Sequence, residues 1–342
     1  MKTVNNRNAS ASAFGWQFQI NIAIYLMIKY FAKFKEMKLE GEKEDIEILL
    51  NNNKKIYAQA KSKQNINDGD TSSYSTKLRK ALESLSDVDD NDSESLIYIS
   101  NLEPNPLNSG TDEFKFVSFF KYNELFLASK KKVDNQLNQL KKKINKDKLI
   151  IAKVPFWGED KETKQKYIIA KIEDFLTFVN QDLLPYKNRF LQMLESEALH
   201  NASQNNMKLK LKKEDVLWRL LYLKLGDGNS IKFDESMEIE EEIFFEALDT
   251  YDRIINYKEA DFDVYNKISN LIMKAKIENK EIRSNQFITK YEKEIYDIVF
   301  KNNKDSDMEI VEKACSKIIA KKIFIRKRNI MQILERANKY EN

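Results

Sequence analysis

Strand-like segments are confined to the first half of this 342-residue chain, and that distribution constrains the fold more than any other feature. Four segments show the alternation or the short apolar runs that strands show: 45–50, 54–61, 96–99 and 149–154. Beyond Pro185 the strand patterns end and helical periods follow almost throughout. We therefore predict an α/β (α+β) domain over residues 1–185 and a helical domain for assembly or partner docking over residues 186–342.

Helical periods separate the strand segments. Apolar residues recur every three to four positions in four stretches: 13–37, 74–86, 130–146 and 163–182. Only seven Gly and four Pro occur in the whole chain, which favours long helices because few residues can interrupt them. The order helix, strand, strand, helix, strand predicts a mixed sheet flanked by helices.

Composition narrows the possible function classes. The chain has 58 Lys and Arg against 54 Asp and Glu, a mild excess that permits contact with nucleic acid without arguing for it. No apolar run reaches the roughly 18 residues of a membrane span, so we expect no membrane contact. The single cysteine, Cys315, excludes an internal disulfide and fits a reducing cytoplasm. The single histidine, His200, excludes chemistry that needs two histidines, and no phosphate-binding Gly-rich loop is present.

The stretch EDIEILLNNNKKIYAQAKSK, residues 44–63, predicts a β-hairpin with residues 51–53 as its turn. Successive side chains of a strand point to opposite faces of the sheet. In a paired hairpin Asp45 of the first strand can therefore meet Gln59 and Lys61 of the second strand on one surface.

Those three residue types suit the hydrolysis of a phosphodiester. A carboxylate and an amide oxygen can hold a hard divalent cation such as Mg²⁺. A lysine beside the cation can orient and help deprotonate the attacking water, and the metal neutralises charge on the phosphodiester. The hairpin thus predicts a metal site made by Asp45 and Gln59, with Lys61 as the catalytic lysine. Glu47 shares a face with Asp45 and is either a further ligand or a solvent-facing acid.

The pattern Asp45…Gln59-x-Lys61 resembles the PD-(D/E)xK, or restriction-endonuclease-like, nucleases, in the variant with Gln in place of the second acid. Glu44 stands where that motif often has proline. Further along, Ser100-Asn101 ends an apolar strand as a Ser/Thr-Asn pair often does in these enzymes.

Two more features carry the same resemblance. The first helix opens Gly15-Trp16-Gln17-Phe18-Gln19, which resembles the G-x-x-[FY]-[EQ] start of such nucleases, where the last position reaches into the site. Glu40 precedes Asp45 as an acid precedes the motif aspartate in the family. The resemblance implies that Glu47, Glu40 and Gln19 support the three hairpin residues.

The strongest resemblance is to the double-strand DNA nuclease domain of bacterial antiphage effectors of the CBASS and Lamassu type, over roughly residues 10–180. It implies a mixed sheet flanked by helices, dependence on Mg²⁺ or Mn²⁺, and non-specific cleavage of double-stranded DNA. The C-terminal half does not suggest a nucleotide-sensor fold. The resemblance therefore implies an effector subunit that partners hold inactive until it is released or forms a homo-oligomer. An SMC-like ATPase and a small accessory subunit, as in a Lamassu complex, are the expected partners.

Two other interpretations stay open. The chain could be a catalytically inactive nuclease fold that serves as a DNA-binding or scaffold subunit, or a helical interaction protein in which the hairpin residues are incidental. The basic runs at residues 321–322 and 326–328 are equally compatible with phosphate binding and with the polar face of a docking helix.

Overall fold

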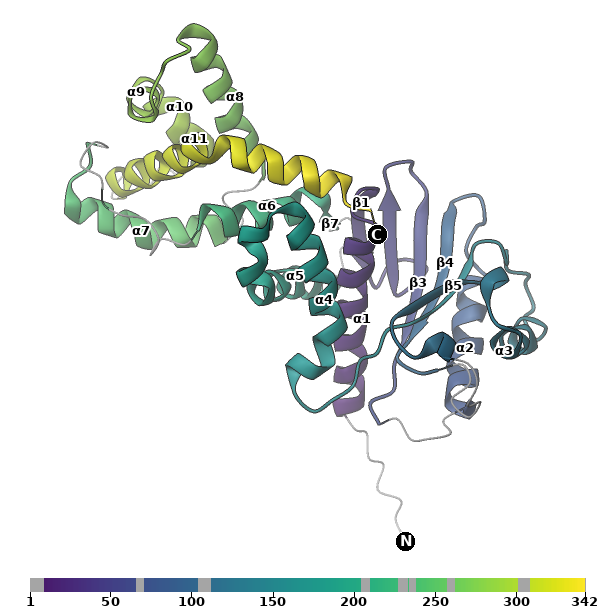
Figure 1. The fold of residues 1–342 in the computed structure, drawn as a ribbon. Helices are drawn as coiled ribbons and strands as arrows, with labels where there is room; N and C mark the ends of the chain where they lie inside the picture. Colours follow the sequence, from purple (N-terminus) through teal and green to yellow (C-terminus); the bar gives the residue numbers. More distant parts are fainter. Residues whose placement is uncertain are drawn as a thin grey trace. The chain divides into compact units, whose positions relative to one another are not determined.

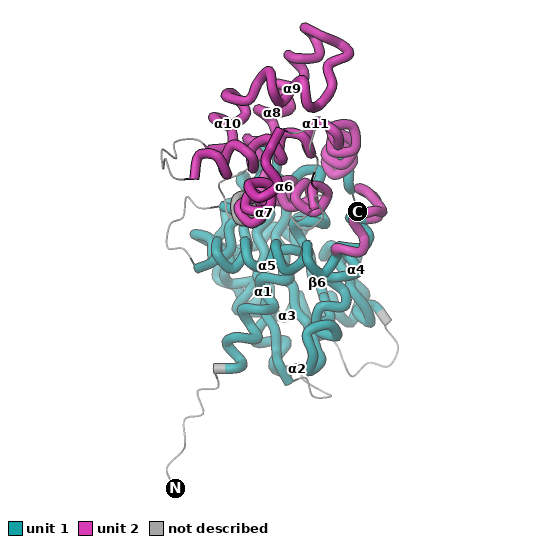
Figure 2. The backbone as a smooth tube through the Cα atoms, turned by 90° about the vertical axis from the view of Figure 1, so that its left-hand side faces the viewer, with its two compact units in different colours: residues 1–176, 187–213, 339–342 teal, residues 177–186, 214–338 magenta. Residues whose placement is uncertain are grey.

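The computed structural model describes residues 9–65, 71–103, 112–203, 210–226, 233, 238–256, 262–300 and 308–341. The chain divides into two compact units (Figure 2). The first, the sheet unit, comprises residues 1–176, 187–213 and 339–342, and the second, the helical unit, comprises residues 177–186 and 214–338. The boundary expected at residue 185 falls within the short segment that belongs to the helical unit, and the helix after it returns to the sheet unit.

The sheet unit is built on a seven-stranded mixed sheet in the order β5-β6-β4-β3-β2-β1-β7. Its strands are β1 (Phe34–Leu39), β2 (Ile46–Leu50), β3 (Lys55–Lys61), β4 (Ser93–Ser100), β5 (Ser118–Lys121), β6 (Leu149–Lys153) and β7 (Leu211–Lys212). β1, β2 and β3 form an antiparallel meander, whereas β3, β4 and β6 are parallel. The predicted fold class, a mixed sheet flanked by helices and followed by a helical region, is confirmed.

Five helices belong wholly or mainly to this unit: α1 (Ala9–Lys29), α2 (Thr71–Leu85), α3 (Leu127–Leu137), α4 (Lys161–Val179) and α5 (Lys187–Ser203). Tyr57 and Tyr98, on adjacent strands, pack with Tyr74 of α2 in one buried cluster. Strand alternation places Ala58 and Ala60 on the opposite face, and α1 runs along the strands there, in contact with β1, β2 and β3 (Figure 1). The sheet is therefore buried on both faces, as the apolar strand sequences require.

The helix predicted over residues 13–37 is too long. α1 ends at Lys29, and Phe34–Leu39 form strand β1 between β2 and β7. Phe34 and Met37 have a helical spacing, whereas Met37 and Leu39 have a strand spacing, and backbone pairing with β2 decides in favour of the strand. The helix predicted over 130–146 is also too long, because α3 ends at Leu137. Strand β7 lies beyond Pro185, where only helices were expected.

The helical unit contains a 3₁₀ helix, η3 (Gln181–Tyr186), and the helices α6 (Lys213–Leu225), α7 (Glu241–Asn256), α8 (Phe262–Glu278), α9 (Ser284–Lys290), α10 (Glu292–Val299) and α11 (Glu309–Lys339). Cys315 is buried within α11. Within the ranges described, none of the helices has both the length and the apolar character that a membrane span needs.

The basic run of α11 has partners inside this unit. Lys322 Nζ donates to the carbonyl of Leu225 at 2.7 Å, and Arg326 donates to the carbonyl of Lys224. Lys327 Nζ donates to the carbonyl of Ser269 at 3.2 Å. Cations at the last carbonyls of a helix stabilise its C-terminus, here that of α6. Part of the run thus stabilises the helical unit itself.

Candidate functional site

The structure brings Asp45 and Lys61 together at one end of the β2–β3 hairpin. Asp45 Oδ2 accepts hydrogen bonds from Lys61 Nζ at 2.9 Å and from the backbone N–H of Ala60 at 3.2 Å. The Asp45 side chain is 13% exposed and that of Lys61 is 30% exposed. The pair is therefore fixed by the hairpin register yet accessible to a substrate.

A second, buried pair lies beside the first. The amide nitrogen of Gln59 donates to one carboxyl oxygen of Glu44, and Ser84 Oγ of α2 donates to the other at 3.0 Å. Glu44 is 3% exposed and Gln59 is 5% exposed. Gln59 thus lies next to Lys61 as expected, but the acid that it contacts is Glu44.

The environment of Glu44 raises its pKa to about 7. Burial is the main cause; the hydrogen bonds from Gln59 and Ser84 oppose it, and the negative charge of Asp45 adds to it. A carboxyl group with this pKa can exchange a proton near neutral pH.

Strand alternation alone would place Glu44 on the face opposite to Asp45. Residues 40–45 instead form a turn, in which Glu40 N–H donates to the carbonyl of Asp45 at 2.8 Å and Gly41 N–H donates to that of Glu44 at 3.0 Å. Glu40 has a left-handed backbone with φ of 47°. The turn removes Glu44 from the period of β2, so the sequence pattern missed it. The one available signal was an acid directly before Asp45.

Glu40 also lies within electrostatic range of the pair. Its pKa is raised, first by burial and then by the charge of Asp45, while the charge of Lys61 lowers it. The charges of Asp45 and Lys61 therefore act on both Glu40 and Glu44.

Glu47 points elsewhere. One of its carboxyl oxygens accepts the backbone N–H of Lys43 at 2.8 Å, and the other accepts Lys55 Nζ at 2.9 Å. A Cβ on Gly41 would lie 2.6 Å from the Glu47 carboxyl carbon, so only glycine fits there without a shift. The bonds that the structure shows for Glu47 hold the turn rather than join it to Lys61.

Gln19 lies on α1 and is partly buried. α1 packs on the face of β3 that carries Ala58 and Ala60, opposite to the face of Gln59. The structure therefore places Gln19 on the other side of the sheet from Gln59.

The Ser100-Asn101 pair fixes the chain after β3. Ser100 Oγ donates to the carbonyl of Lys61 at 2.7 Å. The Asn101 side chain exchanges hydrogen bonds with both backbone groups of Lys63, each at 2.9 Å, and donates to the carbonyl of Phe156 at 3.1 Å. These bonds hold the backbone of Lys61 and Lys63 against the ends of β4 and β6.

The residues of the site include the chemical types that bind a hard divalent cation. Asp45 and Glu44 supply carboxylates and Gln59 an amide, the oxygen ligands that Mg²⁺ and Mn²⁺ prefer. Over the residues that the structure covers, no three or more His, Cys, Asp or Glu side chains are grouped to hold a metal ion. Mg²⁺ is commonly bound by one or two carboxylates and keeps several waters, so two neighbouring carboxylates are sufficient.

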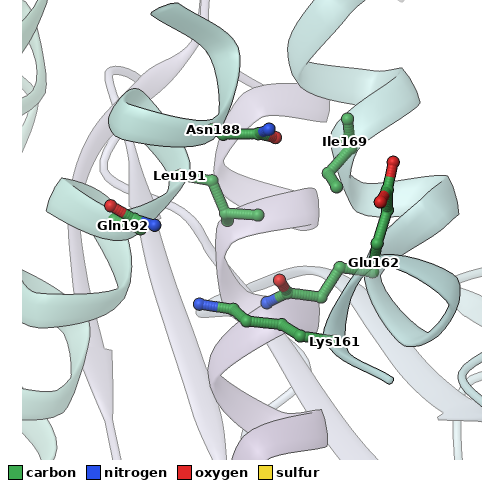
Figure 3. Close-up of a pocket in the computed structure, with 7 residues that line it drawn as sticks. Lys161, Glu162, Ile169, Asn188, Leu191 and Gln192 are labelled. Carbon is green, nitrogen blue, oxygen red and sulfur yellow. The ribbon is translucent and has the colours of Figure 1, made fainter. Parts of the chain in front are cut away.

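A separate cavity of about 160 Å³ lies between α4 and α5 in the sheet unit (Figure 3). Its lining consists of Lys161, Glu162, Gln165, Ile169, Asn188, Leu191 and Gln192. Of these lining residues, Gln165 donates through Nε2 to Asn21 Oδ1 at 2.9 Å and also to Glu195. This buried network joins α1, α4 and α5, and the cavity shares no residue with the hairpin site.

Comparison with family models, curated proteins and solved structures gave no match for this chain. A function can therefore be proposed only from the chemistry of the hairpin site and the resemblance of its motif residues.

Proposed function

We propose that this chain is a metal-dependent DNA endonuclease. The observation that carries the proposal is the 2.9 Å contact between Asp45 and Lys61, beside the buried pair of Glu44 and Gln59, at the end of one hairpin. Acidic, amide and ammonium groups at such a position can bind a phosphodiester and activate water against it. The resemblance of the motif to the PD-(D/E)xK nucleases is the reason for naming DNA as the substrate.

Each residue of the proposed site has its own role in the reaction. Lys61 orients the attacking water and stabilises the negative charge that develops on the phosphate, and Asp45 holds the Lys61 ammonium in place. The pKa of Glu44 is about 7 without a metal, and a cation bound there would keep this carboxyl group ionised as a ligand. Gln59 and Ser84 fix the Glu44 carboxyl group through their hydrogen bonds.

Asp45 and Glu44, with the amide oxygen of Gln59, would hold Mg²⁺ or Mn²⁺. When bound, such an ion neutralises charge on the phosphodiester oxygens. This ligand set replaces Glu47 by Glu44, because Glu44 contacts Gln59 whereas Glu47 is bonded to Lys43 and Lys55.

The proposal extends to a role as effector subunit of an antiphage complex in the cytoplasm, with an SMC-like ATPase and a small accessory subunit as partners. This part depends on the resemblance, and the helical unit is the surface offered to such partners. An unregulated nuclease would damage the cell, so partners that restrain the site are expected.

The test is plasmid cleavage by the purified protein with Mg²⁺ or Mn²⁺, alone and with the proteins encoded beside it. Asp45→Asn should abolish cleavage and weaken Mn²⁺ binding measured by calorimetry, because it removes a ligand charge and the Lys61 partner. Lys142→Gln breaks an exposed ion pair with Asp87 and is the control. Cleavage by Asp45→Asn at the parent rate would contradict the proposed site.

One observation favours an alternative, an inactive nuclease fold that binds DNA as a scaffold. Gln59 occupies the position of the second acid and donates its amide nitrogen to Glu44. That alternative predicts salt-dependent DNA binding without cleavage in either metal, in every combination of partners.

A further inference from the structure

Four lysines gather beside the hairpin site, and we call them the lysine cluster: Lys61, Lys63, Lys77 and Lys80. Lys61 ends β3 and Lys63 follows it, while Lys77 and Lys80 lie on α2. Residues 77, 80 and 84 of a helix form one stripe, because three or four residues complete a turn. Ser84 of that stripe donates to Glu44, and Glu44 also accepts a hydrogen bond from Gln59 of β3. The stripe therefore runs beside the end of β3, where Lys61 lies.

The electrostatics agree with this placement. The pKa of Lys77 is lowered by burial and by the charges of Lys61, Lys63 and Lys80. The ammonium groups of these lysines repel that of Lys77, and an anion bound beside them would remove the repulsion. A chain of phosphates is the biological anion that neutralises several lysines at once.

An exposed aromatic ring lies just beyond the end of β6, two strands from Lys61 in the sheet. Trp157 is 41% exposed, and Lys153 Nζ lies 5.4 Å from the centre of its ring. Lys153 of β6 is in register with Ser100 of β4, which is in register with Lys61 of β3, so the three side chains form one row on one face. The Asn101 side chain accepts a hydrogen bond from the backbone of Lys63 and donates one to the carbonyl of Phe156, the residue before Trp157. Asn101 therefore links the chain at Lys63 to the chain at Trp157.

We propose that the lysine cluster binds the phosphates of a DNA strand while Trp157 stacks on an unpaired base of the same strand. The inference rests on the proposed nuclease function and deepens it. Bases of an intact duplex are stacked inside the helix, so an indole can stack only on a base that has left it. The preferred substrate is therefore DNA with a single-stranded segment.

Binding of a labelled 20-nucleotide single strand tests the cluster, by fluorescence anisotropy in EDTA between 50 and 200 mM NaCl. The variant Lys63→Gln/Lys77→Gln/Lys80→Gln should bind at least tenfold more weakly, with a salt slope shallower by roughly 2, since each single-strand phosphate contact contributes about 0.7. The control Lys131→Gln/Lys141→Gln/Lys143→Gln removes the same charge from exposed lysines of the sheet unit. Equal affinity of the two variants would overturn the inference.

Tryptophan emission tests the stacking. The single strand should quench the tryptophan emission of the parent protein. It should not quench that of Trp157→Phe, because this substitution keeps an aromatic ring for stacking but removes the indole that reports it. Trp157→Ala should lose roughly tenfold in affinity, and Trp157→Phe should keep most of it. A fully paired duplex should bind more weakly and cause little quenching. Unchanged quenching in Trp157→Phe, or equal quenching by the duplex, would overturn the role of Trp157.

The two proposals fail in different ways. Parent protein that binds the single strand through the cluster but cuts no DNA supports the surface and contradicts the nuclease. Parent protein that cuts DNA while the cluster variant binds like its control contradicts the surface and leaves the nuclease standing. Parent protein that neither binds nor cuts contradicts both.

Discussion

Two adjacent acids, Glu44 and Asp45, end the turn that leads into β2 and meet different environments. Asp45 follows the two-residue period of β2 and contacts Lys61, so this contact could be predicted from the sequence. Glu44 belongs to the turn and is buried against Gln59 and Ser84. Its role could not be predicted, because no periodicity describes the conformation of a turn.

At the residue scale, the stability of the sheet unit should depend on pH through Glu44. Its folded pKa of about 7 exceeds the usual 4.5, so the folded state binds more protons than the unfolded state between these values. The free energy of unfolding should therefore fall as pH rises from about 4.5 to about 7, by about 3 kcal/mol.

Glu44→Gln removes the titrating group and should flatten this dependence, with a gain in stability at pH 8. Urea unfolding without divalent metal measures both effects. Glu83→Gln, an exposed acid of α2, is the control and should follow the parent. The same slope in Glu44→Gln as in the parent would show that another group titrates.

At the scale of elements, the hairpin and the parallel strands could be predicted because their apolar patterns are short and bounded. The start of β1 could not, because residues 30–39 carry apolar side chains at both helical and strand spacing. The backbone hydrogen bonds between this segment and β2 select the strand, and the apolar pattern does not show that pairing. β7 has only two residues, too few for any pattern to reveal.

The turn between β1 and β2 should depend on Gly41. In Gly41→Ala the new methyl group displaces the Glu47 carboxyl group, which should weaken its bonds to Lys43 and Lys55 and cost about 1–2 kcal/mol in stability. Chemical unfolding measures this cost. In a Glu47→Ala background the same substitution should cost little, since the displaced group is absent. An equal cost in both backgrounds would assign it to the backbone instead.

The hydrogen bonds from α11 to the last carbonyls of α6 should stabilise the helical unit. Arg326→Ala removes a donor to the carbonyl of Lys224 and should lower the free energy of unfolding by about 1 kcal/mol. Arg328→Ala, at an exposed position on the same helix, should change it by less than about 0.5 kcal/mol. Indistinguishable unfolding curves for the two variants would exclude a capping role.

At the scale of the whole molecule, the sequence predicted a sheet unit and a helical unit because strand and helix periods occupy different parts of the chain. It did not predict that 187–213 would rejoin the sheet unit, since a helical period does not specify what a helix packs against. The proposed site likewise occupies one end of one hairpin, where side chains from β3, α2 and the β1–β2 turn converge.

The most direct test of that proposal is the rate of plasmid cleavage in Mg²⁺ by Lys61→Ala beside Lys55→Ala, with the partner proteins present. Both substitutions remove one lysine of the same strand and one ion pair, to Asp45 and to Glu47 respectively. We predict that Lys61→Ala loses at least 100-fold in rate while keeping its fold by circular dichroism, and that Lys55→Ala stays within a few-fold of the parent. Cleavage by Lys61→Ala at the rate of Lys55→Ala would contradict the assignment of this site.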